Sequence, residues 1–282
     1  MIGIIGAIVG DLIGQSYEFH STKDYNFKLL TDKSHVTDDS TCTIAVADWL
    51  LHTNRTHDEL IDKFKYWCNK YNYGFAPRFK NWVNSDNRAP YNSFGNGSAM
   101  RVSPVAWVAN SLEECIQLAK ISAEVTHNHP EGIKGAITIA IAIYLNRQGK
   151  TKDEIINYIL NETDYKLQSY DELQRTHKFN CICQVSVPAC LTCWYESNSY
   201  EDCIRKAVSL GGDADTEGCI AGSICNANTE TSIDDSFVKQ LCLDGYIPNE
   251  FIDIINEFHE KYEMIEFFKK EKNKEKNKEK NI

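Results

Sequence analysis

Apolar residues recur at three- and four-residue spacing along most of the chain, which is the spacing of one face of an α-helix. Sustained alternation of apolar and polar residues, which marks a half-buried strand, is almost absent. The pattern therefore predicts an all-α protein with little or no sheet. The predicted helical segments are Thr41–His52, Asp58–Tyr71, Leu112–Val125, Ile133–Arg147, Lys152–Glu162, Val187–Ser197, Glu201–Leu210, Glu217–Ala227 and Ile247–Phe268.

The chain begins with an apolar segment in which small residues recur every three or four positions. These small residues are Gly3, Gly6, Ala7, Gly10 and Gly14. Because they would let a neighbouring backbone approach closely, we expect a tightly packed central helix here. Further along, Ser111 and Thr151 each precede a helical segment, which predicts a helix start at both. At Ser111 a glutamate follows three residues later, which fits a capping box.

The length and composition predict one domain. With 282 residues, of which 42% are hydrophobic, the chain can bury a sizeable core. It has no internal repeat and no long linker, so we expect a single domain over residues 1–268. Residues 269–282 form a charged low-complexity run that cannot bury a core, and we expect a solvated tail, with an interaction arm as the alternative.

The charge balance limits the class of ligand. The formal net charge is -10, and the seven lysines and three glutamates of residues 269–282 contribute +4, which leaves -14 for the rest. Proteins that bind nucleic-acid phosphates rely on clustered lysine and arginine, so this acidic body argues against nucleic acid as a partner. A site that binds cations remains compatible with it.

Cysteine usage and hydropathy predict a cytoplasmic protein without a membrane segment. The 11 cysteines are odd in number and irregularly spaced, which favours reduced thiols over a disulfide framework. The apolar N-terminus lacks a basic region and reaches Asp11 before a plausible cleavage site, so it does not fit a signal peptide. No later apolar run approaches the length of a membrane-spanning helix.

Two acidic clusters stand at the starts of apolar helical segments. In TDDS, Asp38 and Asp39 are adjacent; one carboxylate is favoured at a helix start, but two repel each other. In LGGDADT, Asp213 and Asp215 are followed by Thr216. Either cluster alone would be explained by a helix cap and a solvated turn. If the two meet in a helical bundle, their oxygens make a site that suits Mg²⁺, Mn²⁺ or Ca²⁺ better than Zn²⁺.

Other metal sites fit the sequence less well. An EF-hand that begins at Asp213 needs a glutamate at its twelfth position, where Ile224 stands. His127 and His129 supply too few ligands for zinc. Four nearby cysteines lack the paired spacing of zinc knuckles and have apolar neighbours, so we expect buried thiols at Cys181, Cys183, Cys190 and Cys193.

The stretch YNSFGNGSAMRVSP, residues 91–104, places two glycines among serines. Backbone N–H groups in such a loop can face a phosphate or a sugar. The stretch does not complete the pattern G-x-G-x-x-G, because Met100 occupies the third glycine position. By itself this loop is a weak indication of a ligand.

Five motifs in order resemble the ADP-ribosylglycohydrolases of the DraG type, a family that also includes the eukaryotic ADP-ribosylhydrolases. The motifs are GAIVGDLIGQSYEF (6–19), TDDS (37–40), SFGNGSAMRVSP (93–104), THNHPEG (126–132) and LGGDADT (210–216). The resemblance implies a single-domain orthogonal bundle of α-helices with two Mg²⁺ ions at its mouth, for which Mn²⁺ is a possible substitute.

The resemblance also implies roles for individual residues. The metal ligands would be Thr37, Asp38, Asp39, Asp213, Asp215 and Thr216. The loop of Ser93, Phe94, Gly95, Asn96 and Gly97 would hold the diphosphate and the distal ribose, and His127 would contact a ribose. Glu18 would gate the site and act on the attacking water, with Asp39 as a second candidate to take its proton.

The implied activity is hydrolysis of the bond between ADP-ribose and an acceptor, by attack of a metal-activated water at ribose C1″. Arginine-linked protein is the acceptor that the resemblance favours. Serine-linked, nucleic-acid-linked and O-acetyl-ADP-ribose substrates stay open, as does a non-catalytic ADP-ribose-binding protein. The resemblance further implies a monomer that acts on ADP-ribosylated proteins or small-molecule conjugates of ADP-ribose.

Two residues of the second acidic motif depart from the family pattern. Ala214 stands where relatives often have serine or threonine between the aspartates. Glu217 is acidic where an apolar residue is usual, so it either perturbs the site or points to water. These departures affect the expected substrate choice more than the expected metal site.

Overall fold

The protein is helical throughout the part that the structure describes. A computed structural model describes residues 3–263, and every regular element in that range is a helix. Extended pairing within it is limited to one isolated bridge between Gly95 and Ile182. The all-α prediction is therefore confirmed. The predicted boundary between residues 1–268 and 269–282 lies outside the described residues.

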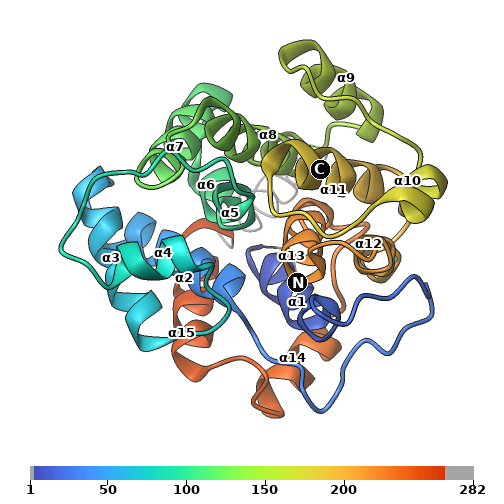
Figure 1. Cartoon of the computed structure of the whole chain (residues 1–282), viewed down its shortest axis with the longest axis horizontal. Coiled ribbons are helices and arrows are strands. Elements are labelled where there is room, and N and C mark those ends of the chain that lie inside the picture. The colour runs from blue at the N-terminus through green and yellow to red at the C-terminus, as the bar shows by residue number, and fades with distance from the viewer. Residues whose placement is uncertain (1–2, 264–282) are drawn as a thin grey trace, which may run out of the picture.

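Most helices are joined by short loops, whereas residues 18–37 and 84–96 form longer ones (Figure 1). In chain order they are α1 (Ile5–Gly14), the 3₁₀ turn η1 (Gln15–Tyr17), α2 (Asp38–His52), α3 (His57–Lys70), α4 (Pro77–Val83), α5 (Gly97–Met100), α6 (Ser103–Val108), α7 (Leu112–Glu124), α8 (Pro130–Arg147), α9 (Lys152–Glu162), α10 (Tyr170–Thr176), α11 (Cys183–Tyr195), α12 (Tyr200–Val208), α13 (Ala214–Cys225), α14 (Asp235–Leu243), α15 (Asn249–Phe258) and the π-helical turn η2 (His259–Glu263).

Each predicted segment contains a helix, with ends that differ by a few residues. The last one, Ile247–Phe268, is occupied by α15 and η2 as far as residue 263, and its remainder lies outside the described residues. Helices α4, α5, α6, α10 and α14 were not predicted. The first four are four to seven residues long, which is too short to show a helical period, and α14 has only nine residues.

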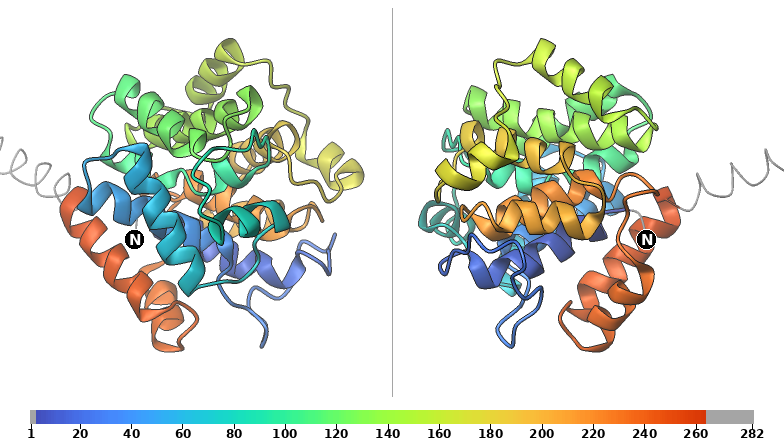
Figure 2. Two further views of the ribbon diagram at one scale, coloured as in Figure 1. Left: turned by 60° about the vertical axis from the view of Figure 1, so that its left-hand side comes forward. Right: turned by 90° about the vertical axis from the view of Figure 1, so that its right-hand side faces the viewer.

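Helices α1 and α13 lie in the middle of the molecule, with α7 and α8 on one side and α14 and α15 on the opposite side (Figures 1 and 2). Every residue of α1 and of α13 is buried. A helix that is apolar all round belongs in such a central position. The predicted central helix is therefore confirmed.

The glycines of α1 allow its backbone to touch the backbone of α13. A Cβ atom on Gly10 would lie 2.1 Å from the Gly218 carbonyl oxygen, and one on Gly14 would lie 2.1 Å from the Ala214 carbonyl oxygen. Any larger residue would push the two helices apart. Because the contacts run antiparallel, the C-terminal end of α1 lies beside the N-terminal end of α13, which brings Asp11 close to Asp215.

Side-chain caps fix the starts of several helices. Thr151 caps the start of α9, as predicted, and makes a complete capping box with Glu154. At α7, the Ser111 hydroxyl accepts from the Glu114 N–H, but the Glu114 carboxylate accepts from Asn110 instead of the Ser111 N–H. The prediction of a cap at Ser111 is confirmed, whereas the prediction of a full capping box there is wrong.

The cysteines are free thiols, in agreement with the predicted absence of disulfides. Cys183, Cys190 and Cys193 are buried as expected. Cys181 is exposed, which corrects the prediction for that residue. Within residues 3–263, no helix has the length and apolar composition that crossing a membrane requires.

Candidate active site

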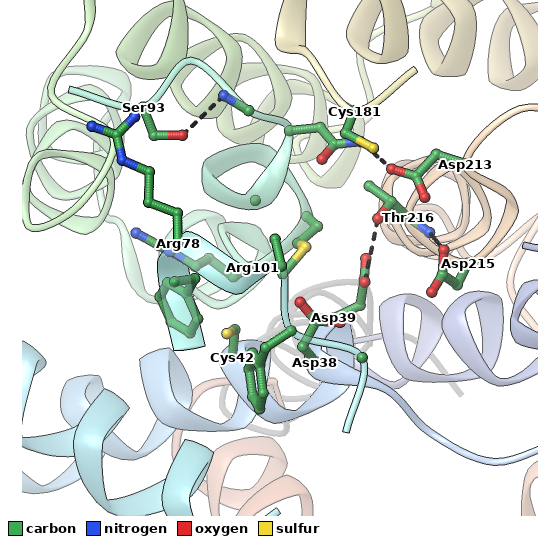
Figure 3. A pocket seen from close by; sticks show the side chains of 18 of the residues that line it. Asp38, Asp39, Cys42, Arg78, Ser93, Arg101, Cys181, Asp213, Asp215 and Thr216 are labelled. Atoms are coloured by element: carbon green, nitrogen blue, oxygen red, sulfur yellow. Dashed lines mark hydrogen bonds between the residues drawn. The ribbon is translucent and has the colours of Figure 1, made fainter. Parts of the chain in front are cut away.

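A pocket of about 460 Å³ opens where segments from across the chain meet (Figure 3). It is lined by the residues that follow η1, the start of α2, the loop before α4, the loop before α5, the loop before α11 and the start of α13. Most of the residues predicted to form the site line this pocket. Thr37 and Phe94 do not line it.

The two acidic clusters meet at one end of the pocket. The Thr216 hydroxyl donates to Asp39 Oδ2 at 3.3 Å, although the two residues are 177 positions apart in the chain. Asp213 and Asp215 come from the turn that begins α13, while Asp38 comes from the first turn of α2. The prediction that these clusters lie together is therefore borne out by their positions.

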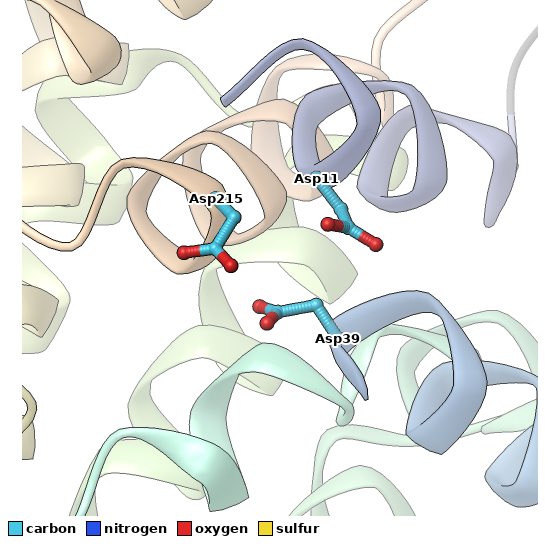
Figure 4. Close-up of side chains that lie close together, drawn as sticks. All are labelled: Asp11, Asp39 and Asp215. Carbon is cyan, nitrogen blue, oxygen red and sulfur yellow. The ribbon is translucent and has the colours of Figure 1, made fainter. Parts of the chain in front are cut away.

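Carboxylates crowd this end of the pocket closely enough to share cations. Oxygens of Asp11, Asp39 and Asp215 lie within 4.8 Å of one another (Figure 4), and so do oxygens of Glu18, Asp213 and Asp215. Asp39 Oδ1 is buried and has no hydrogen-bond partner among the described residues. Burial first, and neighbouring carboxylates next, raise the pKa of Asp39 and Asp215 well above the usual value. Such a group of buried like charges is costly unless cations or protons neutralise it.

Asp11 holds the first acidic turn in place. Its carboxylate accepts from the Thr37 N–H and the Thr37 hydroxyl, both at 2.8 Å, and from the N–H and hydroxyl of Ser40. These bonds fix the backbone that presents Asp38 and Asp39. The sequence analysis did not identify Asp11 as a site residue. The sequence feature that could have marked Asp11 is its position as a carboxylate inside an apolar helical segment, where an unpaired charge would be unfavourable.

Glu18 stands at the mouth of the pocket, directly after η1. It is half-buried, and burial together with the charge of Asp213 raises its pKa to about 7, although a hydrogen bond with Asp215 opposes the shift. A carboxyl group with that pKa exchanges protons readily near neutral pH. Glu18 therefore has the properties that a general acid or base requires.

The glycine loop before α5 lies along the wall of the pocket. Asn96 donates from Nδ2 to Asp213 Oδ2 at 2.7 Å, and its N–H donates to the Cys181 carbonyl at 2.9 Å. Asn96 thus orients one of the acidic residues. Ser93 lines the pocket and accepts from the Gly95 N–H at 3.2 Å. Phe94 is 42% exposed and packs against His129 outside the pocket.

His127 lies next to this loop. Its Nε2 would be 3.1 Å from a Cβ atom on Gly97, so the missing side chain leaves room for the imidazole. Burial and the charges of Arg101 and Arg78 lower the pKa of His127 well below its usual value. The imidazole is therefore neutral at physiological pH, and it can hydrogen-bond to a ligand without adding a charge.

The other end of the pocket carries two arginines that the sequence analysis missed. Arg101 is fully buried, donates from Nη2 to the Ser122 carbonyl and to Thr126 Oγ1 at 2.8 Å, and has no partner for Nε among the described residues. The Arg78 guanidinium lies 4.8 Å from the centre of the Tyr91 ring. A buried guanidinium that lines a pocket favours an anionic ligand.

A second buried acid supports the turn before α13. Glu217 is fully buried, and His177 Nε2 lies 2.6 Å from its Oε1. The pair lies under Gly212, since a Cβ atom there would be 2.5 Å from His177 Nε2 and 2.6 Å from both Glu217 carboxylate oxygens. Glu217 therefore does not point to water, and its hydrogen-bonded pair with His177 packs against the turn that presents Asp213.

Comparison with known proteins places the chain in a family. A family model described as ADP-ribosylglycohydrolase matches residues 2–264 of the chain. The chain belongs to the ADP-ribosylglycohydrolase family. This membership makes it a hydrolase of glycosidic bonds, and it confirms the family that the five motifs indicated.

Relatives within the family are distant in sequence. ADP-ribosylhydrolase ARH3 of Homo sapiens is 24% identical over 79% of this chain and 83% of that protein. ADP-ribosylarginine hydrolase Tri1 of Pseudomonas putida (strain GB-1) is also 24% identical, over 79% of this chain and 68% of its own length. A solved structure of an ADP-ribosylglycohydrolase-related protein complex matches with a TM-score of 0.71 at 20% identity, over 91% of this chain and 95% of that one. That likeness confirms the fold.

Proposed function

We propose that this ADP-ribosylglycohydrolase depends on two divalent cations, Mg²⁺ first and Mn²⁺ as a possible substitute, and releases ADP-ribose by attack of water at ribose C1″. The observation that carries the proposal is the meeting of α2 and α13, where two overlapping groups of three carboxylates lie within 4.8 Å. The buried Asp39 Oδ1, which accepts no hydrogen bond among the described residues, also supports the proposal. Such a cluster is stable near neutral pH when cations compensate its charge.

The donor set fits a hard cation, because it contains only carboxylate and hydroxyl oxygens. The residues that would hold the ions are Thr37, Asp38, Asp39, Asp213, Asp215 and Thr216, with Asp11 behind them. When bound, the ions would supply Lewis acidity that orients the ribose hydroxyls and makes a nucleophilic water available near neutral pH.

Glu18 is the residue that we expect to take the proton of the attacking water. It borders the carboxylate cluster and has a pKa of about 7, so its ionised form is available at neutral pH. Asp39 is the second candidate, but a carboxylate that holds a cation is a weaker base. Glu18 therefore has the better-suited environment.

The two ends of the pocket suit the two ends of ADP-ribose. The carboxylate end suits the ribose whose bond is cut, through the cations. The opposite end offers Arg78, Arg101, the glycine loop at 95–97 and the neutral His127, which together suit a diphosphate and the second ribose. This opposed arrangement supports a nucleotide-sugar substrate.

For the acceptor we propose arginine on a protein, in line with the resemblance to ADP-ribosylarginine hydrolase Tri1. Serine-linked, nucleic-acid-linked and O-acetyl-ADP-ribose substrates are the alternatives, and non-catalytic binding of ADP-ribose is the alternative to an enzyme. We also propose a monomer with a cytoplasmic location.

The test is release of ADP-ribose from arginine-linked and serine-linked proteins and from O-acetyl-ADP-ribose, with Mg²⁺, with Mn²⁺ and after chelation. We expect release that needs the cation, and a loss of about 100-fold or more in kcat/KM for Asp215→Asn, because one of these ligands supports several kcal/mol of charge stabilisation. The matched control is Asp244→Asn, which lies far along the chain at the end of α14. Full activity after chelation would contradict the proposal.

A further inference from the structure

Two phenylalanines stand at the rim of the pocket beside the carboxylates. Phe19 is 76% exposed and Phe179 is 48% exposed, and both line the pocket. Their ring centroids are 6.3 Å apart and their planes are inclined by 34°. Large apolar rings that remain exposed at the mouth of a pocket are typical of contact with a ligand.

Hydrogen bonds hold the two segments of this rim together. The Lys23 ammonium donates to the His177 carbonyl at 3.0 Å and to the Leu210 carbonyl, and Gln174 Nε2 donates to the Lys23 carbonyl at 2.8 Å. Residues 19–23 and 174–179 are therefore tied to each other from two sides. Lys23 is itself exposed, and its ammonium is engaged by these two carbonyl oxygens.

The rim lies at the carboxylate end of the pocket. Phe19 directly follows Glu18, and Phe179 precedes Cys181, whose thiol hydrogen-bonds with Asp213. With the diphosphate at the arginine end, the group attached to ribose C1″ leaves in the opposite direction. The two rings therefore lie at the end of the pocket where the proposed function places the acceptor.

We propose that Phe19 and Phe179 bind the acceptor and select a planar cation, the guanidinium group of arginine. Guanidinium groups stack on aromatic faces by cation–π attraction and by planar contact. The carboxyl group of Glu18 beside the rim adds attraction for a cation. A serine acceptor has neither a positive charge nor a planar group, so the two rings would offer it only apolar contact. This inference rests on the proposed function, because it assumes an ADP-ribosylated acceptor in the pocket.

The experiment compares wild type with Phe19→Leu, Phe179→Leu and the double variant, on arginine-linked and serine-linked substrates. Leucine keeps an apolar side chain and removes the aromatic face. For the double variant we expect kcat/KM to fall about 5- to 30-fold on arginine-linked substrate, and by no more than about 2-fold on serine-linked substrate. Phe19→Trp retains the aromatic face and should retain activity. Tyr66→Leu, an exposed ring on α3, is the matched control.

Binding of free ADP-ribose, which has no acceptor, supplies the second readout. We expect the same Kd for wild type and for all rim variants. Equal losses on both substrates, a wild type that prefers serine-linked substrate, or weaker ADP-ribose binding in the leucine variants would overturn the inference alone. Failure of the wild type to release ADP-ribose from any substrate would overturn the proposed function, and the inference with it.

Discussion

At the scale of single residues, the acidic side chains of the pocket differ in how freely they exchange protons. Asp39 and Asp215 are buried among other carboxylates, whereas Glu18 is half-buried and has a pKa of about 7. Under the proposed function, cation binding and proton transfer would therefore fall to different residues. This division can be tested by removing the titrating group and leaving the rest of the cluster.

Glu18→Gln keeps the size of the side chain and removes its ability to take a proton. We expect kcat to fall by about 10²- to 10⁴-fold, the usual contribution of a general acid or base. The rise in Tm on adding Mg²⁺ should remain, because Asp39 and Asp215 are unchanged. Steady-state kinetics and thermal melts measure both, with the exposed Glu230→Gln as the control. Wild-type kcat in Glu18→Gln would contradict the assignment.

The raised pKa of Glu18 predicts a pH dependence of stability in the metal-free protein. Folding favours its neutral form, since its pKa rises from 4.5 in the unfolded chain to about 7 in the folded chain. The stabilisation is complete below pH 4.5 and is lost as the pH rises through 7. The Tm of wild type relative to Glu18→Gln should therefore fall between pH 5 and pH 8 in the presence of chelator. If the difference in Tm between wild type and Glu18→Gln rises over this pH range, the pKa of Glu18 is not raised in the folded protein.

At the scale of elements, the contact between α1 and α13 positions the acidic residues that those helices carry. Gly10→Ala would place a Cβ atom 2.1 Å from the Gly218 carbonyl oxygen, so the helices must separate. We expect a loss of more than about 2 kcal/mol in the free energy of unfolding, despite the better helix propensity of alanine. Urea denaturation measures it. A stability equal to wild type would show that the two backbones are not in contact.

The turn before α13 depends on the buried pair of His177 and Glu217. His177→Ala leaves the Glu217 carboxylate without its partner, and we expect a loss of about 3–5 kcal/mol in the free energy of unfolding at pH 8. Burial raises the pKa of Glu217 to about 7, so the loss should be smaller at pH 5, where the group is protonated. The exposed His20→Ala serves as the control. An equal loss at both pH values would rule out an ionised Glu217.

The sequence predicted the elements better than their arrangement. Long amphipathic segments such as α3 and α9 show their period over three turns or more, so periodicity locates them. The small residues of α1 predicted close packing, but not that α13 would be the partner. Which distant segments pack together depends on how their side chains fit, and a local sequence pattern does not show this.

At the scale of the whole molecule, the acidic end of the pocket was predictable, and so were the glycine loop and His127 at the opposite end, but the two arginines there were not. Adjacent carboxylates at helix starts are locally unfavourable, and this marked Asp38, Asp39, Asp213 and Asp215. The sequence around Arg78 and Arg101 shows no such unfavourable pairing of charges. The two arginines come together only in the folded chain. Phe94 belonged to a predicted motif, yet its ring packs on His129 outside the pocket.

The whole fold thus joins two helix starts at one pocket, and the central claim is that they bind divalent cations between them. The most direct measurement is the anomalous scattering of a crystal grown with Mn²⁺. We predict two peaks beside the carboxylates of Asp38, Asp39, Asp213 and Asp215, between the starts of α2 and α13. Peaks elsewhere on the protein, or none between α2 and α13 at millimolar Mn²⁺, would contradict the account.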